Sequence, residues 1–238
     1  MSTGLSPQLR ALLEASGPAL SREASRFEPP ASTGPIGREL QGLLAERNGF
    51  YAFESALLVR PSCRDWGAEI PMEQWNQPGL WISRYRGCAD GLLFFAEDIF
   101  GGQFGVDRNG VYMFDPETGD RSLVAETLTE WAEELLVDYS VLTGYPLGHE
   151  WQAAHGRLPS RMRLVPKVPF VLGGAFECGN LRLADAVSAL WERAEIARQI
   201  HGLPDGTDVE LAVGDSASED PSDPGEDPDR NDPDRQGS

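Results

Sequence analysis

The segment His149-Glu150-Trp151-Gln152-Ala153-Ala154-His155 places a glutamate between two of the chain's three histidines. The zinc-protease helix motif combines the same residue types, but its histidines are four residues apart so that both face one metal ion. Here they are six apart, which turns their side chains toward different faces of a helix. We therefore expect no metal site, and we interpret the segment as a polar helix end or loop. A hydrolase of unrecognised type that uses His149, Glu150 and His155 remains a less favoured alternative.

The other residues capable of chemistry do not form a known motif. The cysteines Cys63, Cys88 and Cys178 lack the close paired spacing of a zinc knuckle. Their odd number, without a pairing pattern, is typical of a reduced intracellular protein. The pairs Gly101-Gly102 and Gly173-Gly174 lack the Gly-Lys-Ser/Thr ending of a phosphate-binding loop. The sequence therefore predicts no catalytic residue, no metal and no cofactor.

Two adjacent carboxylates, Glu97 and Asp98, lie between apolar runs. Neighbouring side chains on an extended chain point in opposite directions, which suits neither a shared proton nor a paired acid and base. We interpret them as a polar cluster at a strand end, with one side chain bonded to the backbone of the Gly101-Gly102 turn. Together with Gln103, they are candidates for contact with a partner.

The tryptophans divide into two groups. Trp131 and Trp191 lie on apolar helix stripes and are predicted to be core residues. Trp66 and Trp75 are flanked by Pro, Gly and polar residues, which makes them candidates for exposed partner-binding anchors. Packing under a loop is the alternative for both.

The chain's charge limits its partners. Its 238 residues include 20 basic and 38 acidic side chains, for a formal net charge of −18. Such a surface repels nucleic acid and anionic membranes and suits a basic partner, although solubility alone would also explain it. No apolar run approaches the roughly 20 residues of a membrane span, and Met1–Leu20 has no signal-peptide pattern. We therefore expect a cytoplasmic protein.

Composition also divides the chain into segments. Residues 214–238 are nearly all acidic or small and polar, which predicts a disordered acidic tail. Residues 1–34 are predicted to be a flexible segment, with a short helix at Ser6–Leu13 and a Pro-rich linker before Pro35. The folded domain then covers residues 35–213, with a core at about 35–139 and an extension at 140–213.

The core has the pattern of several strands between helices. We expect strands at Phe50–Val59 and at five later apolar runs, two of them joined by an Asn109-Gly110 hairpin turn. Those runs are Leu80–Tyr85, Gly91–Ala96, Phe104–Asp107, Val111–Asp115 and Arg121–Ala125.

Helices are predicted at Ile36–Arg47, after the N-cap Thr127, and at Leu183–Ile200, with a closing strand at Val209–Val213. Clustered strands with helices at the ends indicate an α+β fold, with an antiparallel twisted sheet flanked by helices and a C-terminal α/β extension.

Several of these segments together resemble the SUKH superfamily, which includes fungal cell-wall-synthesis regulators and bacterial immunity proteins. The resemblance rests on Leu92–Asp107 (LLFFAEDIFGGQFGVD), Gly110–Gly119 (GVYMFDPETG), the helix around Trp131, and an opening helix that ends in Asn48-Gly49. It covers about Pro35 to Tyr139. Known members are binding modules rather than enzymes, and many are thought to neutralise toxins by direct contact.

The resemblance implies a non-catalytic protein-binding module, an immunity protein that neutralises a cognate bacterial toxin. The acidic body would suit a basic, nuclease-like toxin, with electrostatic steering speeding its capture. A housekeeping scaffold or regulator without a toxin partner is the alternative, and the sequence does not separate the two. Neither does it indicate an oligomeric state.

Overall fold

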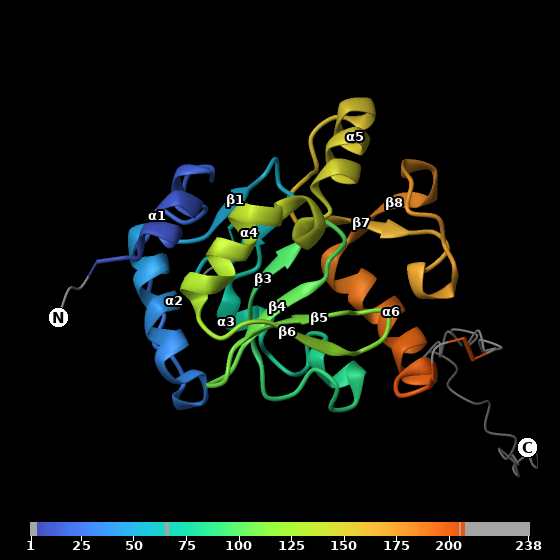
Figure 1. Cartoon of the computed structure of the whole chain (residues 1–238), viewed down its shortest axis with the longest axis horizontal. Coiled ribbons are helices and arrows are strands. Elements are labelled where there is room, and N and C mark those ends of the chain that lie inside the picture. The colour runs from blue at the N-terminus through green and yellow to red at the C-terminus, as the bar shows by residue number, and fades with distance from the viewer. Residues whose placement is uncertain (1–3, 65–66, 205, 208–238) are drawn as a thin grey trace, which may run out of the picture. The chain divides into compact units, whose positions relative to one another are not determined.

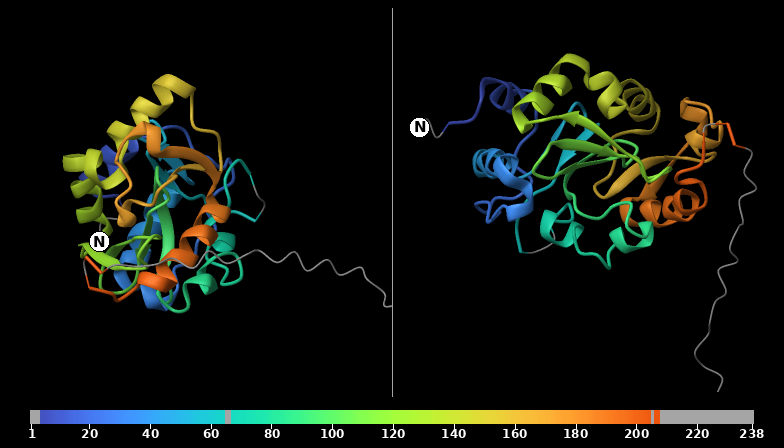
Figure 2. Two further views of the ribbon diagram at one scale, coloured as in Figure 1. Left: turned by 90° about the vertical axis from the view of Figure 1, so that its right-hand side faces the viewer. Right: turned by 60° about the horizontal axis from the view of Figure 1, so that its bottom comes forward.

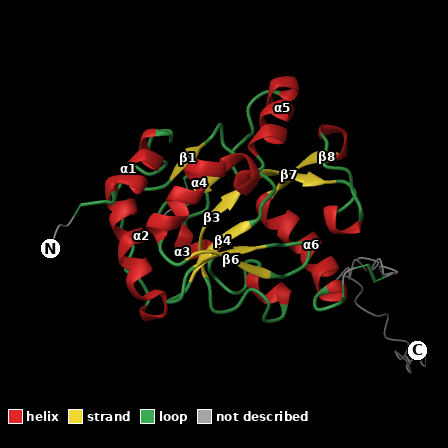
Figure 3. Cartoon of the chain, in the orientation of Figure 1, coloured by secondary structure: helices red, strands yellow, loops and turns green. Residues whose placement is uncertain are grey.

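The computed structural model describes residues 4–64, 67–204 and 206–207. Its helices and strands appear in Figures 1 and 3. The helices are α1 (Pro7–Glu14), α2 (Gly34–Glu46), α3 (Met72–Trp75), α4 (Leu128–Thr143), α5 (Tyr145–His155) and α6 (Ala186–Ile200). The strands are β1 (Phe50–Ala52), β2 (Leu57–Val59), β3 (Leu93–Asp98), β4 (Gln103–Val106), β5 (Val111–Phe114), β6 (Arg121–Ala125), β7 (Met162–Pro166) and β8 (Leu181–Asp185).

Strands β1 to β6 form one antiparallel sheet in which each strand pairs with the next along the chain. Most of these neighbours are joined by short connections, as antiparallel strands can be, whereas residues 60–92, which include α3, connect β2 to β3. Strands β7 and β8 form a separate antiparallel pair. The predicted α+β fold with an antiparallel sheet and a C-terminal α/β extension is confirmed.

The large sheet is covered on both faces, and each face has its own hydrophobic core. Phe95, Phe104 and Val106 pack on one face against α1, α2 and α4. Phe94 and Phe114 pack on the other face against the segment around α3 and against α6. The two faces follow from the alternation of side chains along a strand, which sends Phe94 and Phe95 to opposite sides. Figure 2 shows helices lying on both sides of the sheet.

The N-terminal region differs from the prediction of a flexible segment over residues 1–34. The predicted short helix is present as α1, but Leu9 and Leu12 are buried in the core beside α4. The chain then continues along the sheet, where Gly17 N donates to Tyr51 O over 2.8 Å. Phe27 is buried in the same core. The Pro-rich composition marks irregular backbone here, and the apolar side chains fix that backbone to the domain.

Two predicted strands also differ from the structure. The expected strand Phe50–Val59 is split into β1 and β2 by Phe53, Glu54 and Ser55, which all have positive φ. The apolar run at Leu80–Tyr85 contains a 3-10 helix, Ile82–Tyr85, rather than a strand. The predicted strand Val209–Val213 and the predicted acidic tail at 214–238 lie outside the described residues.

Helix α4 begins as its sequence predicts. Thr127 Oγ1 accepts a hydrogen bond from Glu130 N over 3.1 Å, as an N-cap residue does. The Glu130 carboxylate accepts a hydrogen bond from Glu126 N over 3.0 Å, whereas a standard capping box would use the nitrogen of the N-cap residue, Thr127. None of the helices in the described part of the chain combines the length and apolar composition that crossing a bilayer requires.

Candidate binding groove beside a buried ion-pair network

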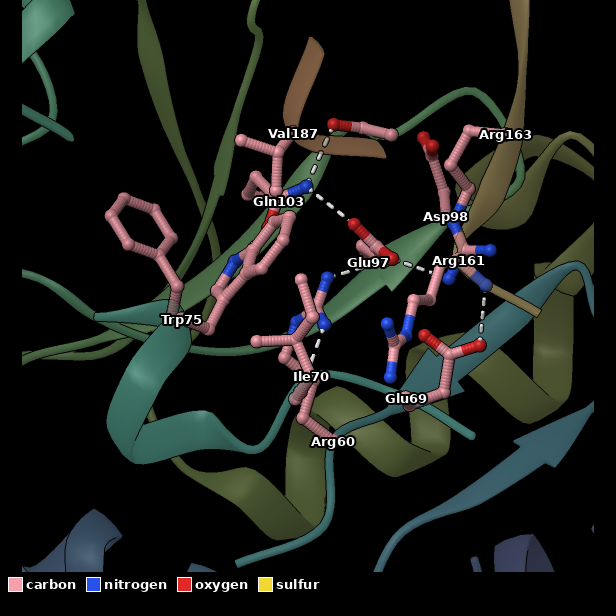
Figure 4. Close-up of polar contacts among 12 residues, drawn as sticks. Arg60, Glu69, Ile70, Trp75, Glu97, Asp98, Gln103, Arg161, Arg163 and Val187 are labelled. Atoms are coloured by element: carbon pink, nitrogen blue, oxygen red, sulfur yellow. Dashed lines mark hydrogen bonds and ion pairs between the residues drawn. The ribbon is translucent and has the colours of Figure 1, made fainter. Parts of the chain in front are cut away.

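Glu97, on β3, lies at the centre of a network of charged side chains inside the protein (Figure 4). Glu97 Oε1 forms ion pairs with Arg60 Nη2, at 2.8 Å, and with Arg163 Nη2 from β7. All three side chains are only 1% exposed. The Arg60 guanidinium also lies 3.3 Å from the centre of the Trp75 ring, a cation–π distance.

A second buried carboxylate completes the charge balance. Glu69 is 2% exposed and accepts hydrogen bonds from Tyr51 Oη and from the backbone nitrogen of Arg161, the latter over 2.8 Å. Two arginines, Arg60 and Arg163, thus face two glutamates. Buried charges persist only when they are paired and hydrogen-bonded, so this balance is what permits the cluster to lie inside the fold.

The network shifts the pKa values of its members. Burial acts to raise the pKa of Glu97, but Arg163 and Arg60 outweigh it and hold that pKa below its usual value. Burial raises the pKa of Tyr51 well above its usual value, and the neighbouring Glu69 adds to the rise. Glu97 is therefore an ionised structural carboxylate, enclosed by its partners.

Trp75 and Gln103 belong to the same network. Gln103 Nε2 donates to Glu97 Oε2 over 2.8 Å, and Gln103 Oε1 accepts from Trp75 Nε1 over 2.8 Å. Trp75 and Gln103 are both 0% exposed. Because they are buried, Trp75, Glu97 and Gln103 cannot touch a partner directly, and their predicted contact role is wrong. The sequence did not reveal this, since surface and buried polar residues carry similar local sequence patterns. Trp75 is buried, but it lies on α3 and packs against Trp81 in the core on one face of the large sheet rather than under a loop.

Asp98 faces the other way, as adjacent strand residues must. Its Oδ1 accepts hydrogen bonds from Phe100 N over 2.8 Å and from Gly102 N over 2.7 Å. This is the predicted bond to the Gly101-Gly102 turn, and it is confirmed. Burial raises the pKa of Asp98 to about 7, against the opposing effects of the Gly102 N–H and the Arg193 guanidinium. Asp98 is thus half-buried, whereas the predicted contact residues Trp75, Glu97 and Gln103 are buried. The fifth predicted contact residue, Trp66, lies outside the described residues.

Asp98 lines a groove of about 400 Å³ between the end of the large sheet and the chain that joins β7 to β8. Three phenylalanines, Phe100, Phe170 and Phe176, pack against one another along it, with ring centroids 5.0 to 5.7 Å apart. Asp115, Glu117 and Arg193 supply its other charged groups. The groove thus combines an aromatic wall with several carboxylates and one guanidinium.

The β7–β8 connection that forms one wall of this groove is held in place by Asn180. The Asn180 amide donates to Val168 O over 2.9 Å and to Ala175 O over 3.0 Å, and its oxygen accepts from Val168 N over 2.9 Å. Glu117 Oε2 accepts from Val171 N over 2.9 Å and so joins the connection to the loop after β5. The wall is therefore fixed by hydrogen bonds along its length.

The structure does not bring His149, Glu150 and His155 together. His149 Nδ1 lies 2.7 Å from Glu54 Oε2 on the exposed surface. His155 stacks on Trp151, and its Nδ1 bonds to the Trp151 carbonyl over 2.9 Å. Within the ranges that the structure describes, no group of three or more His, Cys, Asp and Glu side chains could hold a metal ion.

Sequence reasoning did not identify Arg60, Arg163 or Arg193. Each comes from a different part of the chain, so their meeting depends on the tertiary fold. No sequence pattern predicted that the three phenylalanines of the groove would meet, because Phe100 follows a strand and the other two lie in the irregular connection between β7 and β8.

Comparison with known proteins adds little to this geometry. No protein-family model matches the chain, and no curated protein matches it. Among solved structures, the crystal structure of Atu4351 from Agrobacterium tumefaciens has a TM-score of 0.48 and 12% sequence identity, over 76% of this chain and 86% of that one. A likeness this remote carries no functional conclusion.

Proposed function

We propose that this protein is a non-catalytic protein-binding module, and that the β7–β8 connection with its groove is the surface that holds the partner. The observation that carries the proposal is a concentration of exposed apolar side chains. Val168, Val171, Leu172 and Phe176 are 51%, 42%, 37% and 64% exposed, and all lie within residues 168–176. We call this segment the apolar lip.

The composition and rigidity of the apolar lip both support a binding role. Clustered apolar side chains that remain exposed, with polar groups at their edge, are typical of protein interaction sites. Aromatic anchors such as Phe176 are enriched among residues that dominate binding energy. The hydrogen bonds of Asn180 hold the lip in one conformation, so a partner would not have to order it on binding.

Within this class, we propose an immunity protein that neutralises a basic, nuclease-like toxin. The support comes from the resemblance to the SUKH superfamily and from the net charge of −18, which would speed capture of a basic protein. Asp115 and Glu117 place carboxylates next to the apolar lip. A scaffold or regulator without a toxin partner would use the same surface.

The test is co-expression with each basic protein encoded beside this gene, with growth protection and the dissociation constant as readouts. Phe176→Asp should weaken binding at least tenfold and abolish protection, because it replaces the most exposed apolar side chain of the lip with a charged one. Val137→Asp is the matched control: Val137 is 78% exposed on α4, outside the lip, and its change should leave binding unaltered.

If no neighbouring toxin is bound or neutralised, the immunity function is refuted. If a toxin is bound equally well by both variants, the apolar lip is not the binding surface.

A further inference from the structure

Arg193 has a buried hydrogen-bond donor that lacks a partner. This residue of α6 is 4% exposed and lines the groove. Its Nε donates to Ala189 O over 3.1 Å and its Nη1 to Phe100 O over 2.6 Å. Its Nη2 has no hydrogen-bond partner among the described residues. A buried charged donor without an acceptor is costly, and such groups in native structures call for an explanation.

The backbone opposite Arg193 is shaped to leave this nitrogen room. A Cβ atom on Gly101 would lie 2.7 Å from Arg193 Nη2, and Gly101 has a φ of +82°. Glycine is therefore the residue that this turn requires on both counts. The Arg193 guanidinium acts electrostatically on the carboxylate of Asp98, and both side chains line the same groove.

Asp98 offers the complementary acceptor. Both of the hydrogen bonds that it receives from described residues end on Oδ1. Its Oδ2 therefore keeps capacity to accept a hydrogen bond from a group in the groove. An unused donor on Arg193 and an unused acceptor on Asp98 thus occur in one groove, next to the aromatic wall of Phe100, Phe170 and Phe176.

We propose that the groove binds a peptide amide of the partner protein together with the apolar side chain beside it. The amide carbonyl accepts from Arg193 Nη2, its N–H donates to Asp98 Oδ2, and the apolar side chain packs on Phe100, Phe170 and Phe176. This inference rests on the proposed function, because the partner protein supplies the peptide amide. A groove of about 400 Å³ is within the usual range for small ligands, so one such unit fits.

Charge complementarity selects the neutral amide over charged groups. A carboxylate or phosphate would pair with Arg193 but meet the carboxylates of Asp98, Asp115 and Glu117. An ammonium or guanidinium would pair with those carboxylates but leave Arg193 Nη2 unbonded and add a like charge beside it. An amide carries an acceptor and a donor side by side without net charge, and it satisfies both residues.

The test compares three probes that share one aromatic ring and differ in one polar group: benzamide, benzoate and benzamidine. Binding to the full chain is followed at pH 8, above the Asp98 pKa of about 7 so that its carboxylate is ionised, by shifts of the backbone amide NMR signals. We expect benzamide to shift signals of residues 98–102 and 170–176, with an affinity at least fivefold higher than that of either charged probe. Equal binding of the three probes, or benzamide shifts elsewhere in the protein, would overturn the proposal.

Two variants locate the contact. Asp98→Asn keeps the size of the side chain but presents an amide where the carboxylate acceptor was, and it should weaken benzamide binding at least fivefold. Phe176→Ala changes an exposed side chain, so folding is preserved, and it should weaken benzamide binding severalfold through the aromatic wall. Val137→Ala, an exposed residue of α4, is the matched control and should leave binding unchanged. Unaltered binding in Phe176→Ala would also overturn the proposal.

The benzamide experiment and the toxin-capture experiment can fail independently of each other. If benzamide fails to bind while Phe176→Asp abolishes toxin capture, the peptide-amide site is wrong and the binding surface stands. If benzamide binds in the groove and no toxin is captured, the immunity function falls and the chemistry of the groove stands.

Discussion

Replacing Glu97 with glutamine tests the buried ion-pair network directly. The substitution keeps the shape of the side chain but leaves the guanidiniums of Arg60 and Arg163, each 1% exposed, without their shared counter-ion. Removing one partner of a buried ion pair costs about 3–5 kcal/mol, because the remaining charge cannot be solvated. Here two cations lose the same partner and Glu69 compensates only part of the charge. We therefore expect Glu97→Gln to lower the free energy of unfolding by about 4 kcal/mol.

Urea unfolding measures this loss. With a slope of about 3 kcal/mol per molar urea, a loss of about 4 kcal/mol moves the midpoint by more than about 1 M. Glu192→Gln is the matched control, since Glu192 pairs with Arg182 on the surface and is 54% exposed. Exposed ion pairs contribute little, so that variant should lose less than about 1 kcal/mol.

The pH dependence of the loss has a definite sign. Because the arginines lower the pKa of Glu97 in the folded protein, its contribution is present above the unfolded value, about 4.3, and is lost as pH falls through the folded value. The difference between Glu97→Gln and the natural protein should therefore shrink in acid. A loss below about 1 kcal/mol at pH 7, equal to that of Glu192→Gln, would refute the role given to the network.

Two further predictions concern the N-terminal helix and the groove. Leu12→Ala should lower the free energy of unfolding by about 2–5 kcal/mol, since Leu12 is fully buried against the core; a change near zero in urea unfolding would mean that α1 is not part of the domain. Asp98 should titrate with a pKa of about 7 by carboxyl-carbon NMR. Since this folded value lies above the unfolded one, its contribution to stability is present below about pH 4 and is lost as pH rises through 7. Asp98→Asn should therefore flatten the decline in stability between about pH 4 and 7; identical pH profiles would contradict the shift.

The sequence predicted those features that depend on local patterns. Strand alternation predicted that Glu97 and Asp98 point in opposite directions, and the Thr127 N-cap marked the start of α4. It did not predict the split of Phe50–Val59, because three successive non-glycine residues with positive φ have no sequence signal. Trp191 lies on a predicted core stripe but is 38% exposed, since it sits at the edge of the packed face of α6 and donates to Leu80 O over 2.7 Å.

The candidate site was harder to predict than the fold for a physical reason. Arg60 and Glu97 meet because β2 and β3 are paired, and Arg163 reaches Glu97 only because β7 lies against the end of β3. Such contacts join residues far apart in the chain, which no local pattern records. Flanking composition suggested exposure for Trp75, whereas tertiary packing buried it.

Strand β3 links the stability of the protein to the shape of its groove. Glu97 binds Arg163 of β7 from one side of the strand, and immediately after β3 the carbonyl of Ile99 accepts from Leu164 N over 3.0 Å. These two contacts fix β7, and β7 leads directly into the apolar lip. Asp98, between them in sequence, forms part of the opposite wall of the groove. The charged network therefore does more than stabilise the core: it holds the apolar lip at a set position relative to Asp98, and the binding site that we propose there would require such preorganisation.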